Sequence, residues 1–289
     1  MLLIPVQLDA NSLKRKSTSA ASFSRQRFEF KIEPVCNRIL KYSFCFLIIL
    51  ASCFWLIYPI HLNGAFITFT NFRCIAPNIY VSPDTPDSIQ VKLIESIRSA
   101  RVRSIEMWGS LKSNSKVIYC HDSIVENKYN PTKSKSGFVI SPFFHHIVIG
   151  PSGLDSNAIG HEMCHAELFE RLPFPKWVYS QYVVPTWFDE GLAMQMNLEH
   201  RYSKEMWDKY SDANKELVPN LQALEDRNFF YGELQWYNYT YSKIELARWL
   251  RVVGKNGLNK FVTEISINNF YSNYKKVESG NTGDIKPSR

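Results

Sequence analysis

The sequence predicts an α+β protein in which one apolar N-terminal segment precedes a single domain. Three observations lead to this fold class. Short β-type runs are confined to residues 78–150, apolar residues recur with helical spacing from about residue 156 onward, and an uncharged apolar stretch occupies residues 42–60. Strands that come before most of the helices are typical of an α+β arrangement, here a small sheet with helices followed by a helical lobe.

The stretch from Tyr42 to Ile60 has no charged side chain and lies between Lys41 and His61. As a helix it is about as long as the hydrocarbon core of a bilayer is thick. A buried core helix and a cleaved signal peptide are the alternatives. The stretch has no polar face, however, and it begins about 40 residues from the N-terminus, which fits neither of them well. We expect a transmembrane signal anchor at residues 42–60.

Positive charge is concentrated before this stretch. Residues 1–41 hold eight Lys or Arg against three Asp or Glu, which is +5 of the whole chain's +7, and only Arg73 follows within the next twenty residues. The positive-inside rule then keeps the basic tail in the cytoplasm and turns the domain outward, as in a single-pass protein of the cell membrane. The domain itself has no charge pattern that indicates nucleic-acid binding.

Changes in composition set the remaining boundaries. We expect a linker at residues 61–76, one domain at residues 77–277 and a disordered tail at residues 278–289. Outside the cytoplasm, Cys74 and Cys120 could form a disulfide. Two unpaired buried thiols are the alternative, since connectivity cannot be read from spacing.

Strands are expected at four short runs rich in β-branched and aromatic residues, and the last two form a candidate hairpin. The runs are Asn78–Val81, Val117–Cys120, Gly137–Ile140 and His145–Gly150. Helices are expected where the apolar period is near 3.6. They cover residues 88–107, 156–171, 186–196, 203–209, 241–253 and 258–265. Gly254 and Gly257 mark a turn between the last two helices, and the prolines of residues 172–185 predict a loop.

The motif His161-Glu162-Met163-Cys164-His165 carries the clearest chemical signal. Histidines four residues apart on a helix lie on one face, so both can bind a single zinc ion. Glu162 then flanks the metal as a candidate general base for the activation of water. The bare motif also arises by chance, so it needs a third ligand. Leu168 and Arg171 replace the Gly and His of the extended metzincin motif, which excludes that class.

A carboxylate from a following helix would complete a His₂Glu set with one open position for water. The segment Pro185–Ala193 reads PTWFDEGLA and offers Glu190. Gly191 and Ala193 are small, which would let this helix approach the metal-bearing helix closely. Trp187 and Phe188 can bury a large apolar area beside the site.

HEMCH followed by WFDEGLA resembles the gluzincin metallopeptidases, whose second motif reads Trp-x-x-Glu-Gly-x-Ala. The resemblance covers about residues 138–265. It implies a zincin-like domain that holds one Zn²⁺ ion on His161, His165 and Glu190, with Glu162 as the catalytic glutamate. The motifs are separated by 24 residues, more than in the thermolysin-like and aminopeptidase-like groups, so the subfamily stays open.

The resemblance also implies that an edge strand before the metal helix binds the substrate backbone, and His145–Gly150 is our candidate. His145 and His146 are neighbours on that strand, so they point to opposite faces and cannot both reach one metal. A downstream tyrosine that stabilises the oxyanion is implied as well, and we choose Tyr241. Asp189 would either orient a histidine or be solvated.

The expected function is therefore that of a membrane-tethered zinc metallopeptidase with a peptide or protein substrate and Glu162 as general base. Cys164 lies beside a ligand, but we expect it to point away from the metal face as a small core residue. The alternative function is a non-catalytic zinc-binding module that keeps the gluzincin fold to bind a peptide or a cell-wall partner.

Overall fold

The computed structural model describes residues 33–57, 59–130, 134–213, 215, 218–266 and 268–281. The chain divides into two units, residues 1–52 and 53–289. The predicted basic tail lies outside the described residues as far as residue 32. The predicted disordered tail lies outside them from residue 282, whereas residues 278–281 belong to a helix.

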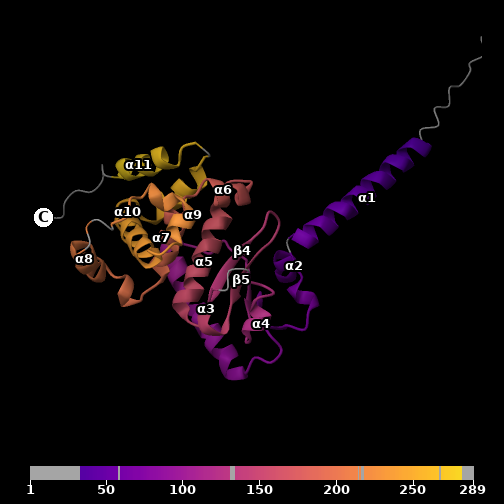
Figure 1. Ribbon diagram of the computed structural model, residues 1–289, viewed down its shortest axis with the longest axis horizontal. Coiled ribbons are helices and arrows are strands. Elements are labelled where there is room, and N and C mark those ends of the chain that lie inside the picture. Colours follow the sequence, from indigo (N-terminus) through magenta and orange to yellow (C-terminus); the bar gives the residue numbers. More distant parts are fainter. Residues whose placement is uncertain are drawn as a thin grey trace, which may run out of the picture. The chain divides into compact units, whose positions relative to one another are not determined.

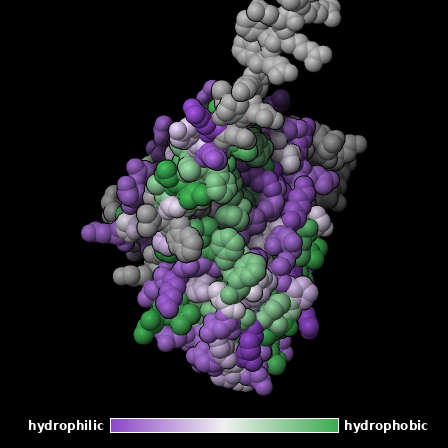
Figure 2. All heavy atoms as spheres, turned by 90° about the vertical axis from the view of Figure 1, so that its right-hand side faces the viewer, coloured by the Kyte–Doolittle hydropathy of each residue, from purple (hydrophilic) through white to green (hydrophobic). Residues whose placement is uncertain are grey.

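Helix α1 (Glu33–Ile57) is a single helix that covers most of the predicted anchor (Figure 1). Its large apolar side chains between Ile39 and Leu50 are exposed. More widely, hydrophobic side chains lie exposed among hydrophilic ones on one face of the molecule (Figure 2). Within the described part of the chain, no helix combines the length and apolar character needed to cross a membrane. The anchor at residues 42–60 is thus not seen, and it stays a prediction together with its orientation.

A mixed sheet of five strands forms the first part of the larger unit. The strands are β1 (Arg73–Ala76), β2 (Ile79–Val81), β3 (Lys116–Tyr119), β4 (Ser136–Ile140) and β5 (His145–Ile149). Their order is β1-β2-β3-β5-β4, in which β2, β3 and β5 are parallel and the outer two strands are antiparallel to their neighbours. The four predicted strands are confirmed, and β1 is an addition.

The edge strand next to the metal helix is β4, so our choice of residues 145–150 as the edge was wrong. The predicted hairpin forms, and its turn is closed by the Ser141 amide, which donates to the Phe144 carbonyl at 2.8 Å. Its second strand pairs with β3, which leaves the first strand outermost. The reason is visible in β5 itself: Ile147, Val148 and Ile149 are all buried, as in a strand that is covered on both faces.

Helices cover both faces of this sheet (Figure 1). One face packs against α3 (Asp87–Trp108) and α5 (Ser156–Arg171). The other face packs against η1 (Ile67–Phe69) and α4 (Ser123–Glu126), with Ile67 completely buried.

Residues 61–76, which we expected to be a linker, are part of the folded unit. They contribute most of α2 (Pro59–Ala65), then η1 and β1. Gly64 of α2 lies directly on the imidazole of His146, because a Cβ atom built there would be 2.1 Å from that ring. Only glycine allows this approach, so the absence of a side chain at residue 64 lets α2 pack directly against β5.

Cys74 and Cys120 are free thiols, so the predicted disulfide was wrong. Cys74 lies on β1 and Cys120 directly follows β3, with β2 between the two strands. Neighbouring strands are about 4.8 Å apart, so the two cysteines are separated by roughly 10 Å, well beyond the span of a disulfide. The alternative was also only half right, because Cys120 is buried and Cys74 is exposed.

The helical lobe follows α5. Its helices are α6 (Lys176–Tyr182), α7 (Thr186–Ala193), α8 (Lys204–Ala213), α9 (Arg227–Phe230), α10 (Gln235–Glu264) and α11 (Phe270–Asn281). Short 3₁₀ turns lie at residues 194–196, 200–202 and 223–225. The predicted loop at residues 172–185 instead contains α6. The predicted turn at Gly254 is confirmed, because its φ of 63° interrupts α10.

Aromatic side chains fill the core of this lobe. The Phe188 ring of α7 lies 6.0 Å from the Trp249 ring and 5.2 Å from the Phe261 ring, both on α10. All three side chains are completely buried. Each such ring removes about 150–250 Å² from water, so α7 is fixed firmly against α10.

Candidate metal centre

Helix α5 packs against the sheet on one face and against the helical lobe on another. Its third face carries the candidate site. Ile159 and Met163 pack toward the sheet, whereas Cys164 and Leu168 pack into the lobe. The helix is capped by Asp155, whose Oδ1 accepts the amides of residues 157 and 158 at 2.8 and 2.9 Å. The helix predicted at residues 156–171 is therefore confirmed.

Three side chains from α5 and α7 converge on one point. His161 Nε2 lies 3.1 Å from Glu190 Oε2 and 3.1 Å from His165 Nε2, and His165 Nε2 lies 3.6 Å from Glu190 Oε2. The structure thus brings the three predicted ligands together as a group that could hold a metal ion. Glu190 is buried, and His161 and His165 are partly exposed toward the cavity.

These distances fit a tetrahedral metal site. Ligand atoms at 2.0–2.1 Å from a tetrahedral zinc ion are about 3.3 Å apart, which lies within the observed range of 3.1–3.6 Å. Glu190 Oε2 is also buried without a well-directed hydrogen-bond donor. An anionic oxygen in that position is unfavourable unless a cation compensates it. The donor set of two imidazoles and one carboxylate is one that Zn²⁺ binds.

The electrostatics of the group favour a cation as well. Burial alone would raise the pKa of Glu190, but His165 and His161 hold it well below its usual value. Burial would likewise lower the pKa of His165, but Asp189 and Glu190 raise it well above the ordinary histidine value. Two carboxylates therefore stabilise positive charge at this point of the cavity.

The ligands are held by a second set of hydrogen bonds. Asp189 Oδ1 lies 2.6 Å from Nδ1 of His165, which directs Nε2 of that ring toward the centre. Of the two roles left open for Asp189, the structure supports the orienting one. The Tyr231 hydroxyl donates to Glu190 Oε1 at 2.5 Å, so it fixes the carboxylate with Oε2 facing the histidines. Such partners commonly set the geometry and affinity of a metal site.

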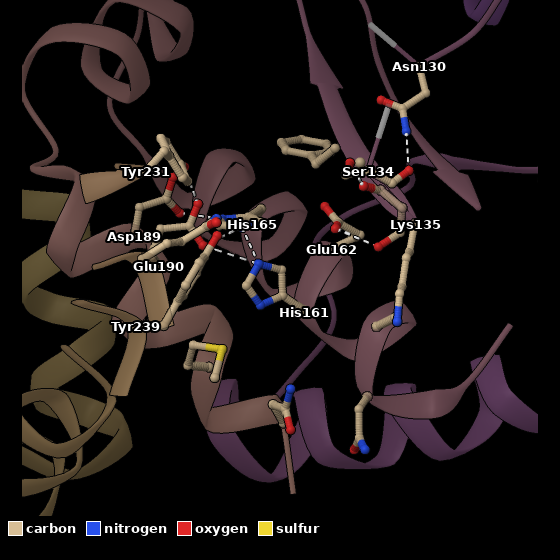
Figure 3. Close-up of a pocket in the computed structure, with 18 of the residues that line it drawn as sticks. Asn130, Ser134, Lys135, His161, Glu162, His165, Asp189, Glu190, Tyr231 and Tyr239 are labelled. Carbon is tan, nitrogen blue, oxygen red and sulfur yellow. Dashed lines mark hydrogen bonds and ion pairs between the residues drawn. The ribbon is translucent and has the colours of Figure 1, made fainter. Parts of the chain in front are cut away.

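Glu162 lies beside the centre and is not part of the ligand group. It is buried, and its Oε1 accepts a hydrogen bond of 2.8 Å from the hydroxyl of Ser136. Ser136 is the first residue of β4. Lys135, which directly precedes it, lies on the Glu162 side of the cavity (Figure 3). The predicted base is therefore tied to the edge strand.

The tyrosine that we predicted for this site is elsewhere. Tyr241 does not line the cavity, and its ring packs 5.6 Å from Trp207. Tyr231 and Tyr239 line the cavity instead, on the side opposite Glu162 (Figure 3). Burial raises the pKa of Tyr239 far above its usual value, and the charges of Glu190 and Glu162 raise it further. This hydroxyl is therefore a neutral hydrogen-bond donor.

Sequence reasoning missed Tyr231, Tyr239 and Ser136. Tyr239 could have been considered from the sequence, because it lies only two residues from Tyr241. Residues 239 and 241 face different sides of one helix, so only one of them can line the cavity. Tyr231 and Ser136 lie far from both motifs in the chain, and no sequence signal points to them.

The remaining predictions about the motifs are largely confirmed. His145 Nε2 contacts Glu170 on the α5 face of the sheet at 2.8 Å, whereas His146 lies under Gly64 on the opposite face. Neither belongs to the metal group. Cys164 is completely buried in the core. Gly191, however, approaches α10 and not the metal-bearing helix, because its Cβ would lie 2.7 Å from the Ser242 carbonyl.

The centre opens into a cavity of about 780 Å³. All five residues of β4 form one wall, and Asp189, Glu190, Tyr231 and Tyr239 lie on the other (Figure 3). A cavity of this size is ample for several residues of a peptide. Comparison of the chain with protein-family models, with curated proteins and with solved structures gave no match.

Proposed function

We propose that this protein is a zinc-dependent peptidase. The observation that carries the proposal is the separation of roles at one point: His161, His165 and Glu190 converge as a ligand group, while Glu162 faces the same cavity without joining them. When bound there, a zinc ion supplies Lewis-acid polarisation of the substrate carbonyl and lowers the pKa of water. The resemblance of both motifs to the gluzincins supports the same assignment.

The chain's own residues have distinct tasks in this proposal. Glu162 accepts the proton of the attacking water and returns it to the leaving amine. Tyr239 donates a hydrogen bond to the developing oxyanion, because its hydroxyl is neutral and close enough to interact with both Glu162 and Glu190. Asp189 and Tyr231 keep His165 and Glu190 in position.

The edge strand β4 is suited to hold the substrate. Its inner side is paired with β5, and its outer side is not paired with another strand of the sheet. An extended peptide can add to such an edge through main-chain hydrogen bonds. Substrate backbone along β4 lies next to Glu162, since Ser136 at the start of the strand contacts that carboxylate.

The first prediction tests catalysis against mere binding. We expect the full-length, zinc-loaded protein to cleave a fluorogenic peptide library, and Glu162→Gln to keep the metal but lose at least about 100-fold in kcat. Metal content is measured by mass spectrometry. Glu205→Gln on the exposed surface of α8 is the matched control. If the parent binds zinc and peptides but cleaves none, the protein is a binding module and the proposal fails.

A further inference from the structure

The cavity carries a lysine on the side of the proposed base. Lys135 directly precedes β4, lines the cavity and is exposed. Its side chain extends along the wall that also holds Glu162, opposite Tyr231 and Asp189 (Figure 3).

This charge is uncompensated among the described residues, where Lys135 forms no ion pair. Two other charged groups that line the cavity already have partners. Arg201 Nε binds Glu199 at 2.6 Å, and its guanidinium lies 4.7 Å from the centre of the Tyr202 ring. Asp155 accepts two amides at the start of α5. An exposed ammonium that faces a binding cavity without a partner is suited to an anionic group of the ligand.

The direction of β4 tells which part of a peptide reaches this lysine. Ser136 at the start of β4 contacts Glu162 of α5, and Phe138 farther along packs 5.9 Å from Phe169 near the end of α5. The strand therefore runs beside α5 in the same direction. Antiparallel pairs are slightly more stable per residue than parallel ones, and they are more common. A substrate strand paired in this way places its C-terminal part beside Lys135.

The register of the substrate on β4 determines how far from the cleaved bond Lys135 can contact the substrate. Glu162 acts at the reacting carbonyl. Because Ser136 contacts Glu162, we place this carbonyl beside the first residue of β4. Lys135 is the next residue toward the C-terminal side of the substrate. Strand residues are spaced by about 3.3 Å, so a lysine side chain from this position covers the first two substrate residues after the cleaved bond.

We propose that Lys135 forms a carboxylate subsite, so that this protein acts on peptides with a carboxylate within two residues after the cleaved bond. The inference rests on the proposed peptidase function. The carboxylate is either the C-terminus of the peptide or the side chain of Asp or Glu, since both offer the same group to an ammonium.

Peptide binding to the full-length, zinc-loaded Glu162→Gln variant tests this without turnover. The probes are fluorescein-labelled hexaalanine as the free acid and as the amide, and the amide with Glu or Gln at the fifth position. Fluorescence anisotropy gives each Kd. We expect the free acid, the Glu peptide or both to bind about tenfold more tightly than their neutral counterparts, the gain of one charge-assisted hydrogen bond. The member that gains affinity identifies the source of the carboxylate.

Three further substitutions, each added to this variant, make the test specific. Lys135→Gln should bring acid and neutral peptides to equal affinity, and Lys135→Arg should keep the preference. Arg227→Gln removes a charge at Gln181, on another part of the cavity wall, and should leave the ratio unchanged. Equal affinities in the parent variant, or a preference that survives Lys135→Gln, would overturn the inference. A preference in binding without hydrolysis by the zinc-loaded parent would instead refute the proposed function and keep the subsite.

Discussion

Ser136 connects the reacting carboxylate to the strand that is suited to hold the substrate. Its hydroxyl is buried and donates to Glu162 Oε1, which leaves Oε2 as the oxygen available to water. The backbone at this point is held by the residue that follows β5, because the Gly150 amide donates to the Lys135 carbonyl at 3.0 Å. Gly153 lies so close to that carbonyl that no Cβ fits there. The orientation of Glu162 therefore depends on the start of β4.

A second prediction follows for Ser136. We expect Ser136→Ala to lower kcat about tenfold with little change in KM or zinc content, since one hydrogen bond to a charged group is lost. Ser136→Thr keeps the hydroxyl and should restore most of the rate. Steady-state kinetics and metal analysis measure both effects. If Ser136→Ala lost its metal, or if Ser136→Thr were equally slow, a role in orienting Glu162 would be ruled out.

The third prediction separates three tyrosines. Tyr239→Phe should lower kcat by about 100-fold or more, because an oxyanion donor is lost. Tyr231→Phe should weaken zinc binding by about 10-fold or more, because Glu190 loses its partner. Tyr241→Phe is the control, since Tyr241 packs on Trp207 and does not line the cavity. Kinetics and a competitive zinc titration distinguish the three outcomes. A loss of rate in Tyr241→Phe alone would reverse our assignment in favour of the sequence-based one.

At the scale of elements, α7 is positioned by its fit against α10. Gly191 follows the ligand Glu190 directly, and a Cβ there would lie 2.7 Å from the Ser242 carbonyl and 3.0 Å from the Leu246 side chain. A carbonyl oxygen of a helix cannot move aside easily. The small residue after Glu190 thus brings α7 close to α10, while the opposite side of α7 presents the ligand to α5.

The fourth prediction concerns this contact. We expect Gly191→Ala to lower the free energy of unfolding by about 1–3 kcal/mol through overpacking, and to weaken zinc binding because Glu190 moves with its helix. Gly280→Ala in α11 is the matched control, because nothing lies within 4 Å of its Cβ position. Urea unfolding and zinc titration are the measurements. Unchanged stability in Gly191→Ala would show that α10 yields, against our interpretation.

At the scale of the whole larger unit, a buried ion pair joins the sheet-bearing part to the helical lobe. Arg171 and Glu167 of α5 pair with almost no exposure. Glu167 also accepts the amides of Lys112 and Ser113 in the connection before β3, at 2.9 and 3.0 Å. Arg171 donates to Asn259 of α10 at 3.0 Å. The group therefore connects three segments that are distant in sequence.

The fifth prediction is that Arg171→Met destabilises the whole unit by about 3–5 kcal/mol, because Glu167 would remain buried without its counter-ion. Arg248→Met is the control. Arg248 is also in ion pairs, with Glu245 and Glu278, but its side chain is 46% exposed. Its removal should therefore change the free energy of unfolding by at most about 1 kcal/mol. Chemical unfolding measures both variants. Equal effects would mean that burial of the Arg171 pair has no special consequence.

The sequence by itself determined the features that depend on neighbours along the chain. Short runs rich in β-branched and aromatic residues placed the four predicted strands. Helical periodicity, in which side-chain direction repeats every 3.6 residues, placed the two motif helices. The spacing of His161 and His165 fixed both imidazoles on one face of a helix. The small residues around Glu190 indicated a close helix contact, although the partner helix had to be found in three dimensions.

The tertiary structure decided everything that depends on which segments meet. It made β4 the edge strand in place of β5, kept Cys74 and Cys120 apart across β2, and brought residues 61–76 onto the sheet. It also brought Ser136 to Glu162 and Tyr231 to Glu190, pairs that are 26 and 41 residues apart. Such contacts depend on the packing of several elements at once, and no local pattern of residues encodes them. The ligands of the candidate centre could therefore be predicted, whereas the side chains that orient them could not.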